Sequence, residues 1–107
     1  MQFPEAVLKV KEFVPTGDHI YLVGGAIRDV LLGLPSKDFD FICSSNPRTI
    51  AHKFADYHHG AFYMLDEERN TCRVIIEPKH PQRMIFDFAQ VRGDSIFDDL
   101  MERDFTI

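Results

Sequence analysis

The sequence predicts an α+β domain in which helices flank a mixed sheet of about five strands. Its 107 residues suit one domain, and its 45% of apolar residues are enough for one core. Segments with helical spacing lie before, between and after short apolar or alternating runs. Five such runs have the character of strands: residues 20–23, 38–43, 61–65, 71–76 and 84–90.

The first part of the chain is expected to form a helix, a strand and a second helix. Over residues 3–13, apolar side chains recur near helical spacing, which indicates a short amphipathic helix. The apolar run at 20–23 predicts a buried strand that ends at Gly24 and Gly25. Good helix formers occupy residues 26–32, so a second helix follows the glycine turn directly.

The middle of the chain is expected to form an alternating strand and a longer helix. Apolar and polar side chains alternate over residues 38–43, which is the pattern of a strand with one buried face. Asn46 followed by Pro47 is typical of a helix start, because proline suits the first helical position. This helix is expected to run to about Tyr57.

Three further strands are expected after this helix, at 61–65, 71–76 and 84–90. Polar residues 66–70 predict a hairpin between the first two of them, and residues 77–83, with two prolines, predict a polar loop. Ser95 can cap a last helix that extends through Glu102, since Asp98 follows at the spacing of a capping box.

Composition and charge exclude several classes of protein. A formal net charge of −5 argues against strong nucleic-acid binding by this chain alone, because neutralising phosphates needs clustered lysine and arginine. Cys43 and Cys72 are isolated in the sequence, so a zinc site is not expected. Both are expected to be buried free thiols. The sequence has neither a secretory signal nor an apolar stretch of about 20 residues, so we expect a cytoplasmic protein without membrane contact.

Asp38 and Asp40 are the strongest candidates for chemistry. Residues two apart on a strand point to the same face, roughly 6.5 Å from each other. Two neighbouring carboxylates repel, and a divalent cation relieves that repulsion. Oxygen ligands favour Mg²⁺ (or Mn²⁺), and two such ions can activate a hydroxyl and steady a leaving pyrophosphate. The alternative is a solvated strand face, because an isolated Asp-x-Asp pattern is common.

The segment upstream favours the metal interpretation. Gly24 and Gly25 lie where an apolar strand meets a helix, and glycine lets backbone N–H groups approach phosphates closely. Arg28 follows about one helical turn later and can reach a triphosphate held there. Each feature alone fits an ordinary turn with a surface arginine. Together with Asp38 and Asp40, they place phosphate donors and metal ligands in one compact unit.

Two segments resemble a known family. Residues 22–41, which read LVGGAIRDVLLGLPSKDFDF, resemble the signature of class II tRNA nucleotidyltransferases (CCA-adding enzymes) and bacterial poly(A) polymerases. Residues 99–107, DLMERDFTI, resemble the second motif of the same family. That motif usually has two arginines before its aspartate, whereas this sequence has Glu102 before Arg103. At Glu102, a negative side chain therefore stands where the family motif usually has a positive one.

The resemblance implies a polymerase-β-like nucleotidyltransferase fold. It also implies that Asp38 and Asp40 bind Mg²⁺ as catalytic residues. Asp29 would fix the turn or the helix by pairing with a neighbouring basic group. The nucleotide would be held by five residues: Gly24, Gly25, Arg28, Arg103 and Asp104.

Asp87 is a candidate third catalytic carboxylate. It is a polar residue in an apolar strand, between Phe86 and Phe88, whose side chains would point to the opposite face. The alternative is a structural aspartate held by hydrogen bonds. Nothing in the sequence decides between the two.

The family reaction is the attack of an RNA 3′-hydroxyl on the α-phosphate of CTP or ATP. CCA addition to tRNA is the expected activity, with poly(A), A-only or CC-only addition and a non-catalytic nucleotide-binding domain as alternatives. The partners would be ATP, CTP and the tRNA 3′ end. The chain ends in the apolar segment Phe105–Ile107, so residues 1–107 are expected to be a truncated catalytic head without neck, body and tail domains.

Overall fold

A computed structural model describes residues 3–34, 37–77 and 83–90 of the chain. These ranges form one five-stranded sheet and three α-helices, α1 (Glu5–Lys9), α2 (Gly25–Leu31) and α3 (Pro47–His58), with a 3-10 helix, η1, at Val10–Phe13. The strands are β1 (Ile20–Val23), β2 (Asp38–Cys43), β3 (Ala61–Asp66), β4 (Thr71–Ile76) and β5 (Met84–Gln90). The predicted α+β class with a five-stranded sheet is confirmed.

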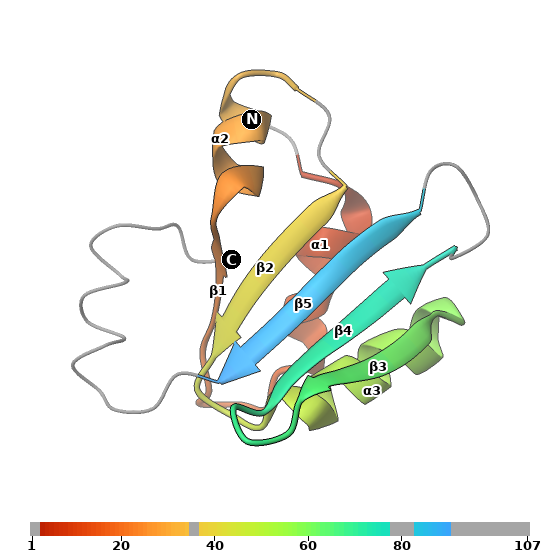
Figure 1. Ribbon diagram of the computed structural model, residues 1–107. Coiled ribbons are helices and arrows are strands. Elements are labelled where there is room, and N and C mark those ends of the chain that lie inside the picture. Colours follow the sequence, from red (N-terminus) through yellow and green to blue (C-terminus); the bar gives the residue numbers. More distant parts are fainter. Residues whose placement is uncertain (1–2, 35–36, 78–82, 91–107) are drawn as a thin grey trace.

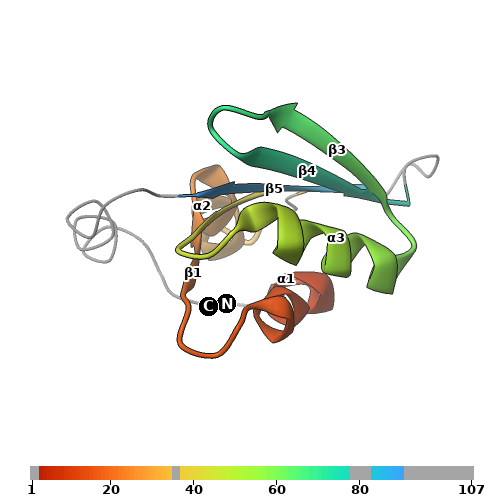
Figure 2. The same ribbon diagram turned by 90° about the horizontal axis from the view of Figure 1, so that it is seen from below.

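The sheet is mixed, with the strand order β1-β2-β5-β4-β3 (Figure 1). β2 pairs antiparallel with β1 and parallel with β5, whereas β5 with β4 and β4 with β3 are antiparallel. Helices α1 and α3 lie on one side of the sheet (Figure 2). We call the opposite side the carboxylate face, because Asp38, Asp40 and Asp87 lie on it.

The core lies between the sheet and its helices. Along β2, every second side chain is buried, namely Phe39, Phe41 and Cys43, and on β5 the buried side chains are Phe86 and Phe88, on either side of Asp87. The rings of Phe41 and Phe88 stack at a centroid distance of 5.2 Å, and Phe54 of α3 lies 4.8 Å from Phe86. Burying each such ring contributes about 1.5–3 kcal/mol. This core holds the central strands rigidly and leaves their other face for polar side chains.

Helix α3 begins at the residues that the sequence indicated. The Asn46 side chain accepts a hydrogen bond from the backbone N–H of Arg48 at 3.1 Å, and Pro47 is the first helical residue. The helix ends at His58, where His59 takes the left-handed conformation with φ 55°.

The N-terminal helix differs from the expected single helix over residues 3–13. Only Glu5–Lys9 is α-helical, and Val10–Phe13 is a 3-10 helix. The reason is Pro15, because a residue before proline avoids helical geometry. Val14 is extended, with φ −87° and ψ 128°, and the tighter 3-10 turn closes the helix just before it. The predicted last helix, residues 95–102, lies outside the described residues.

Candidate functional site

One row of paired residues crosses the carboxylate face from edge to edge. Each member is the cross-strand partner of the next, and we call them the central row: Val23, Asp40, Asp87, Arg73 and Tyr63. Asp38 lies on the same face of β2, two residues before Asp40. The register therefore brings three carboxylates from the two central strands together, with a guanidinium beside them.

The pKa of Asp40 is shifted by its surroundings. Partial burial raises its pKa above the ordinary value, the negative charges of Asp87 and Asp38 raise the pKa further, and Arg73 opposes them. Like charges directly opposite each other on neighbouring strands are destabilising. The negative charge of Asp40 is therefore unfavourable in this setting, and a bound cation would stabilise it.

Arg73 forms a two-pronged ion pair with Asp87. Its Nε–H donates to Oδ1 at 2.8 Å, and its Nη2 donates to Oδ2 at 3.0 Å. These hydrogen bonds raise the pKa of Arg73. Asp87 thus has the contacts of a hydrogen-bonded structural aspartate, and a catalytic role for it stays a prediction. Sequence reasoning missed Arg73, although a charged residue between Cys72 and Val74 in an apolar strand was a signal.

The glycine turn between β1 and α2 lies against Asp40. Gly24 has φ 82° and ψ −158°, a conformation that residues with a side chain rarely adopt. A Cβ atom added at Gly24 would lie 3.3 Å from Oδ2 of Asp40. The absence of a side chain therefore lets the turn approach the carboxylate closely.

Arg28 folds back over the same turn. A Cβ atom added at Gly25 would lie 3.5 Å from Nη2 of Arg28. Asp29 pairs with a basic neighbour, as expected, since its Oδ1 lies 3.6 Å from Nη2 of Arg28. The Arg28 side chain is 74% exposed, so its guanidinium remains accessible to an anion at the turn.

The carboxylates of β2 fit a magnesium ion. In the three described ranges, no group of three or more His, Cys, Asp or Glu side chains is arranged to hold a metal. Mg²⁺ does not need such a group, because it usually keeps several waters and takes one or two carboxylates plus substrate phosphates. Asp38 and Asp40, two oxygen donors at the foot of the glycine turn, match that demand, and Mn²⁺ accepts the same ligands.

The predicted site residues are thus partly assembled in the described chain. Asp38, Asp40 and Asp87 lie together on the carboxylate face, and the turn carrying Gly24, Gly25 and Arg28 adjoins them. Arg103, Asp104 and the unusual Glu102 lie outside the described residues. The roles of all of them stay predictions.

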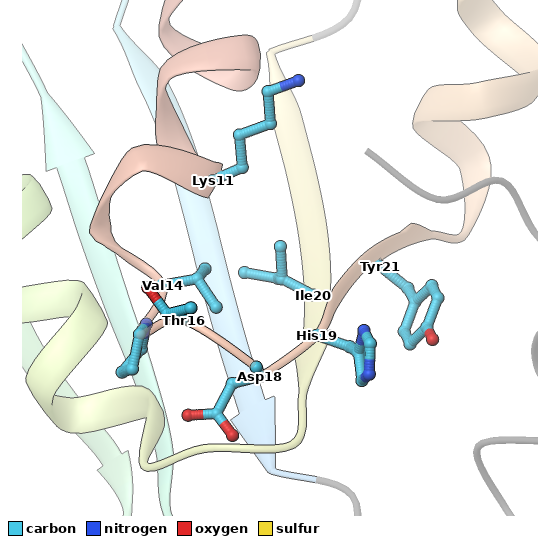
Figure 3. A pocket seen from close by; sticks show the side chains of 9 residues that line it. Lys11, Val14, Thr16, Asp18, His19, Ile20 and Tyr21 are labelled. Atoms are coloured by element: carbon cyan, nitrogen blue, oxygen red, sulfur yellow. The ribbon is translucent and has the colours of Figure 1, made fainter.

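A pocket of about 290 Å³ lies elsewhere, between the end of η1 and the start of β1 (Figure 3). Residues 14–21 and Lys11 line it, and none of the predicted site residues does. The pocket is therefore separate from the carboxylates.

Comparison with known proteins places this arrangement in a family. The family model described as the Poly A polymerase head domain matches residues 20–107, which include β1, the glycine turn and the central strands. The chain belongs to this family. The resemblance seen in residues 22–41 and 99–107 is therefore confirmed.

Curated relatives of the chain include enzymes that act on tRNA. It is 38% identical over 87 residues to a CC-adding tRNA nucleotidyltransferase of Geobacter sulfurreducens, covering 81% of this chain and 20% of the relative. It is 34% identical over 118 residues to a CCA-adding enzyme of Streptococcus mutans, covering 99% and 28%. The chain thus spans between a fifth and three-tenths of the length of these relatives.

Solved structures agree with the fold. A tRNA-processing enzyme in an apo form matches with a TM-score of 0.67 and 28% identity over 98% of this chain and 28% of that one. A tRNA nucleotidyltransferase complexed with a primer tRNA and an incoming ATP analog matches with a TM-score of 0.61 and 27% identity over 94% of this chain and 28% of that one. The chain is homologous to nucleotidyltransferase head domains. No helix in its described part is long and apolar enough to cross a membrane.

Proposed function

We propose that this chain is the catalytic head of an enzyme that transfers CMP or AMP from CTP or ATP to the 3′-hydroxyl of tRNA, completing its CCA end. The observation that carries the proposal is the position of Asp38 and Asp40 beside the Gly24–Gly25 turn, in a chain of this family. Homologous structures bound tRNA, an ATP analog or CTP, which supports the substrate classes.

Asp38 and Asp40 would hold Mg²⁺ (or Mn²⁺), which lowers the charge on the transferred phosphate and steadies the leaving pyrophosphate. In the reaction, the RNA 3′-oxygen forms a bond to the α-phosphorus and releases its proton to solvent. The bond between the α-phosphorus and the oxygen that bridges to the β-phosphate breaks, and pyrophosphate leaves. Asp87 would contribute to the site as the cross-strand partner of Asp40, and the catalytic role expected of it stays a prediction.

The nucleotide would be held by the glycine turn and by a second segment. Gly24 and Gly25 offer backbone N–H groups without side chains in the way, and Arg28 offers an exposed guanidinium. Arg103 and Asp104 would contact the nucleotide, with Asp104 near the ribose. Positioning and electrostatics supply most of the catalysis in such a site.

The proposal assigns only the head to this chain. Base selection and tRNA binding would depend on neck, body and tail domains, in keeping with relatives about four times as long. A cytoplasmic location belongs to the same proposal and accords with two buried free cysteines, Cys43 and Cys72.

CC-only addition is the second candidate. Four CC-adding relatives show identities of 38%, 39%, 36% and 31%, compared with 34% for the CCA-adding enzyme of Streptococcus mutans, so three of the four exceed it. In that case the parent enzyme would use CTP and stop after two nucleotides. Extension of a tRNA that lacks CCA by the full-length protein, with CTP alone and then with both nucleotides, separates the two activities.

Nucleotide binding by the purified chain tests the proposal. We expect Mg²⁺-dependent binding of CTP and ATP in calorimetry, and its loss in Asp40→Ala. Asp56→Ala, which removes an exposed carboxylate of α3, is the matched control and should bind as the wild type does. Equal binding by Asp40→Ala, independent of metal, would indicate a non-catalytic nucleotide-binding domain instead.

The assignment of the head alone has its own test. The 107-residue chain is expected not to extend tRNA, even with both nucleotides and Mg²⁺ present. Robust CCA addition by this chain would refute that part of the proposal and leave the metal site standing.

A further inference from the structure

Arg73 is the basic member of the central row, and it lies next to two acidic members. Asp40 and Asp87 face each other on neighbouring parallel strands, and such like-charged neighbours destabilise a sheet. Arg73 approaches from β4, on the other side of Asp87. Along the row, Asp40 is followed by Asp87 and then by Arg73, and Arg73 forms its ion pair with the nearer acid, Asp87.

The contact between Arg73 and Asp87 involves both carboxylate oxygens. The two hydrogen bonds, at 2.8 and 3.0 Å, form the fork geometry in which arginine binds carboxylates most strongly. The Arg73 side chain is 38% exposed and that of Asp87 is 22% exposed, so solvent screens the pair only in part. Asp87 is consequently tied toward β4, away from its neighbour on β2.

The charges of this cluster are unevenly compensated. Asp38, Asp40 and Asp87 carry three negative charges, and Arg73 carries one positive charge. Arg73 donates two hydrogen bonds to Asp87, so its charge compensates Asp87 first. The repulsion between Asp40 and its neighbours is then left for a divalent cation to relieve.

We propose that Arg73 is a positioning residue that keeps Asp87 out of the coordination shell of the divalent cation. The cation is then held by Asp38 and Asp40 alone, and its other coordination positions stay open to the substrate, as Mg²⁺ sites that act on phosphates require. This inference rests on the proposed function. It gives Asp87 a purpose other than metal binding, which is to fix Arg73 beside the site.

Mn²⁺ binding to the purified 107-residue chain tests the inference, with affinity measured by calorimetry. Arg73→Gln removes a positive charge and frees Asp87 to become a third ligand, so we expect Mn²⁺ to bind roughly fivefold tighter. Asp87→Asn should cost more affinity in the Arg73→Gln background than in the wild type, because Asp87 becomes a ligand only after its release. Circular dichroism of each variant checks that it is folded.

Two results would overturn the inference. One is unchanged or weaker Mn²⁺ binding by a folded Arg73→Gln variant, which is expected if Arg73 is merely structural or if it orients Asp87 as a ligand. The other needs no variant: in the wild type, the Nε–H resonance of Arg73 should keep its hydrogen-bonded position when the chain is saturated with Mg²⁺. Its movement to a solvent-exposed position would show that Asp87 has left Arg73 for the metal.

Asp40→Asn separates failure of this inference from failure of the proposed function. If this variant binds Mn²⁺ as well as the wild type, the metal is not held at Asp40, and the proposed function fails with the inference. If it loses Mn²⁺ binding while Arg73→Gln does not tighten it, only the role of Arg73 is wrong.

Discussion

Gly24 is constrained both by its backbone conformation and by its closeness to Asp40. Its φ of 82° disfavours any side chain, and a Cβ atom there would also lie 3.3 Å from Oδ2 of Asp40. Gly17 has a similar φ of 92°, but a Cβ atom there would have no neighbour within 4 Å. A side chain at Gly17 would therefore cause backbone strain only, whereas a side chain at Gly24 would cause backbone strain and also contact Asp40.

Alanine at either glycine should destabilise the chain, and only one should change metal binding. We expect Gly24→Ala and Gly17→Ala each to cost about 1–2 kcal/mol in urea unfolding, because both impose a positive φ on a residue with a side chain. Gly24→Ala should also weaken Mn²⁺ binding, since its methyl group displaces the Asp40 carboxylate. Equal Mn²⁺ affinity in the two variants would contradict this account of the turn.

The charge on Asp40 should reduce the stability of the metal-free chain. The pKa of Asp40 in the folded chain is raised above 3.8. The protonated carboxyl of Asp40 therefore adds its full contribution to the free energy of unfolding below pH 3.8, and this contribution is lost as the pH rises through the raised pKa. Asp40→Asn should therefore raise the melting temperature near neutral pH in the presence of a chelator, and the gain should vanish as pH falls toward 3.8. A variant that melts below the wild type near neutral pH would show that Asp40 is stabilising.

At this scale, the sequence predicts which side chains share a face but not which ones pair. The period of two along a strand put Asp38 and Asp40 opposite Phe39, Phe41 and Cys43, and this alternation is confirmed. The bond from Arg73 to Asp87 depends on the register of β4 against β5, which local patterning does not determine. A lone charge in each of two apolar strands was the available hint.

At the scale of elements, helix α3 is tied to the β3–β4 hairpin through its cap. Oδ1 of Asn46 accepts from the backbone N–H of Arg48 at 3.1 Å and from Nδ2 of Asn70 at 2.9 Å. One side chain thus caps the helix that supports the sheet and holds the turn of the hairpin beside it.

Loss of this cap should be measurable as a loss of stability. Asn46→Ala removes both hydrogen bonds and is expected to cost about 1–2 kcal/mol in urea unfolding. Asn46→Asp keeps an acceptor oxygen in the same place and should stay within a few tenths of a kcal/mol of the wild type. An equal loss in both variants would mean that the cap contributes little.

Most helices and strands could be predicted from the sequence, but the order of the strands in the sheet could not. β1, β2, β4 and β5 have the expected bounds, and β3 extends one residue further, to Asp66. The order β1-β2-β5-β4-β3 was not predictable, because it requires β2 and β5 to pair in parallel across more than 40 residues of chain. That pairing sets Asp40 beside Asp87, so the composition of the site depends on tertiary structure rather than on a local motif.

For the molecule as a whole, the two cysteines report on the integrity of the core. Cys43 and Cys72 are fully buried at the core face of β2 and β4, and burial raises the pKa of the Cys43 thiol to about 12. Reagents that react with thiolates should therefore react slowly with the folded chain, because both sulfur atoms are protonated and buried.

Thiol labelling should consequently follow unfolding of the whole domain. We expect slow reaction of both cysteines with a disulfide reagent near pH 8, and labelling rates that rise with urea in parallel with the loss of circular dichroism. The variant Cys72→Ala keeps only Cys43, so its labelling rate shows whether the two cysteines become accessible together or independently. Rapid labelling of one cysteine in a chain that remains folded would reveal local opening of its strand.

The parallel pairing of β2 with β5 has a consequence for the order in which the domain folds. Hairpin β3–β4 can form from neighbouring residues, whereas the pairing of β2 with β5 needs a strand from the far end of the described chain. Contacts between such distant segments form slowly, because a long loop has to close first. During synthesis, Asp38 and Asp40 leave the ribosome well before Asp87, so the three carboxylates come together only after the last central strand has been made.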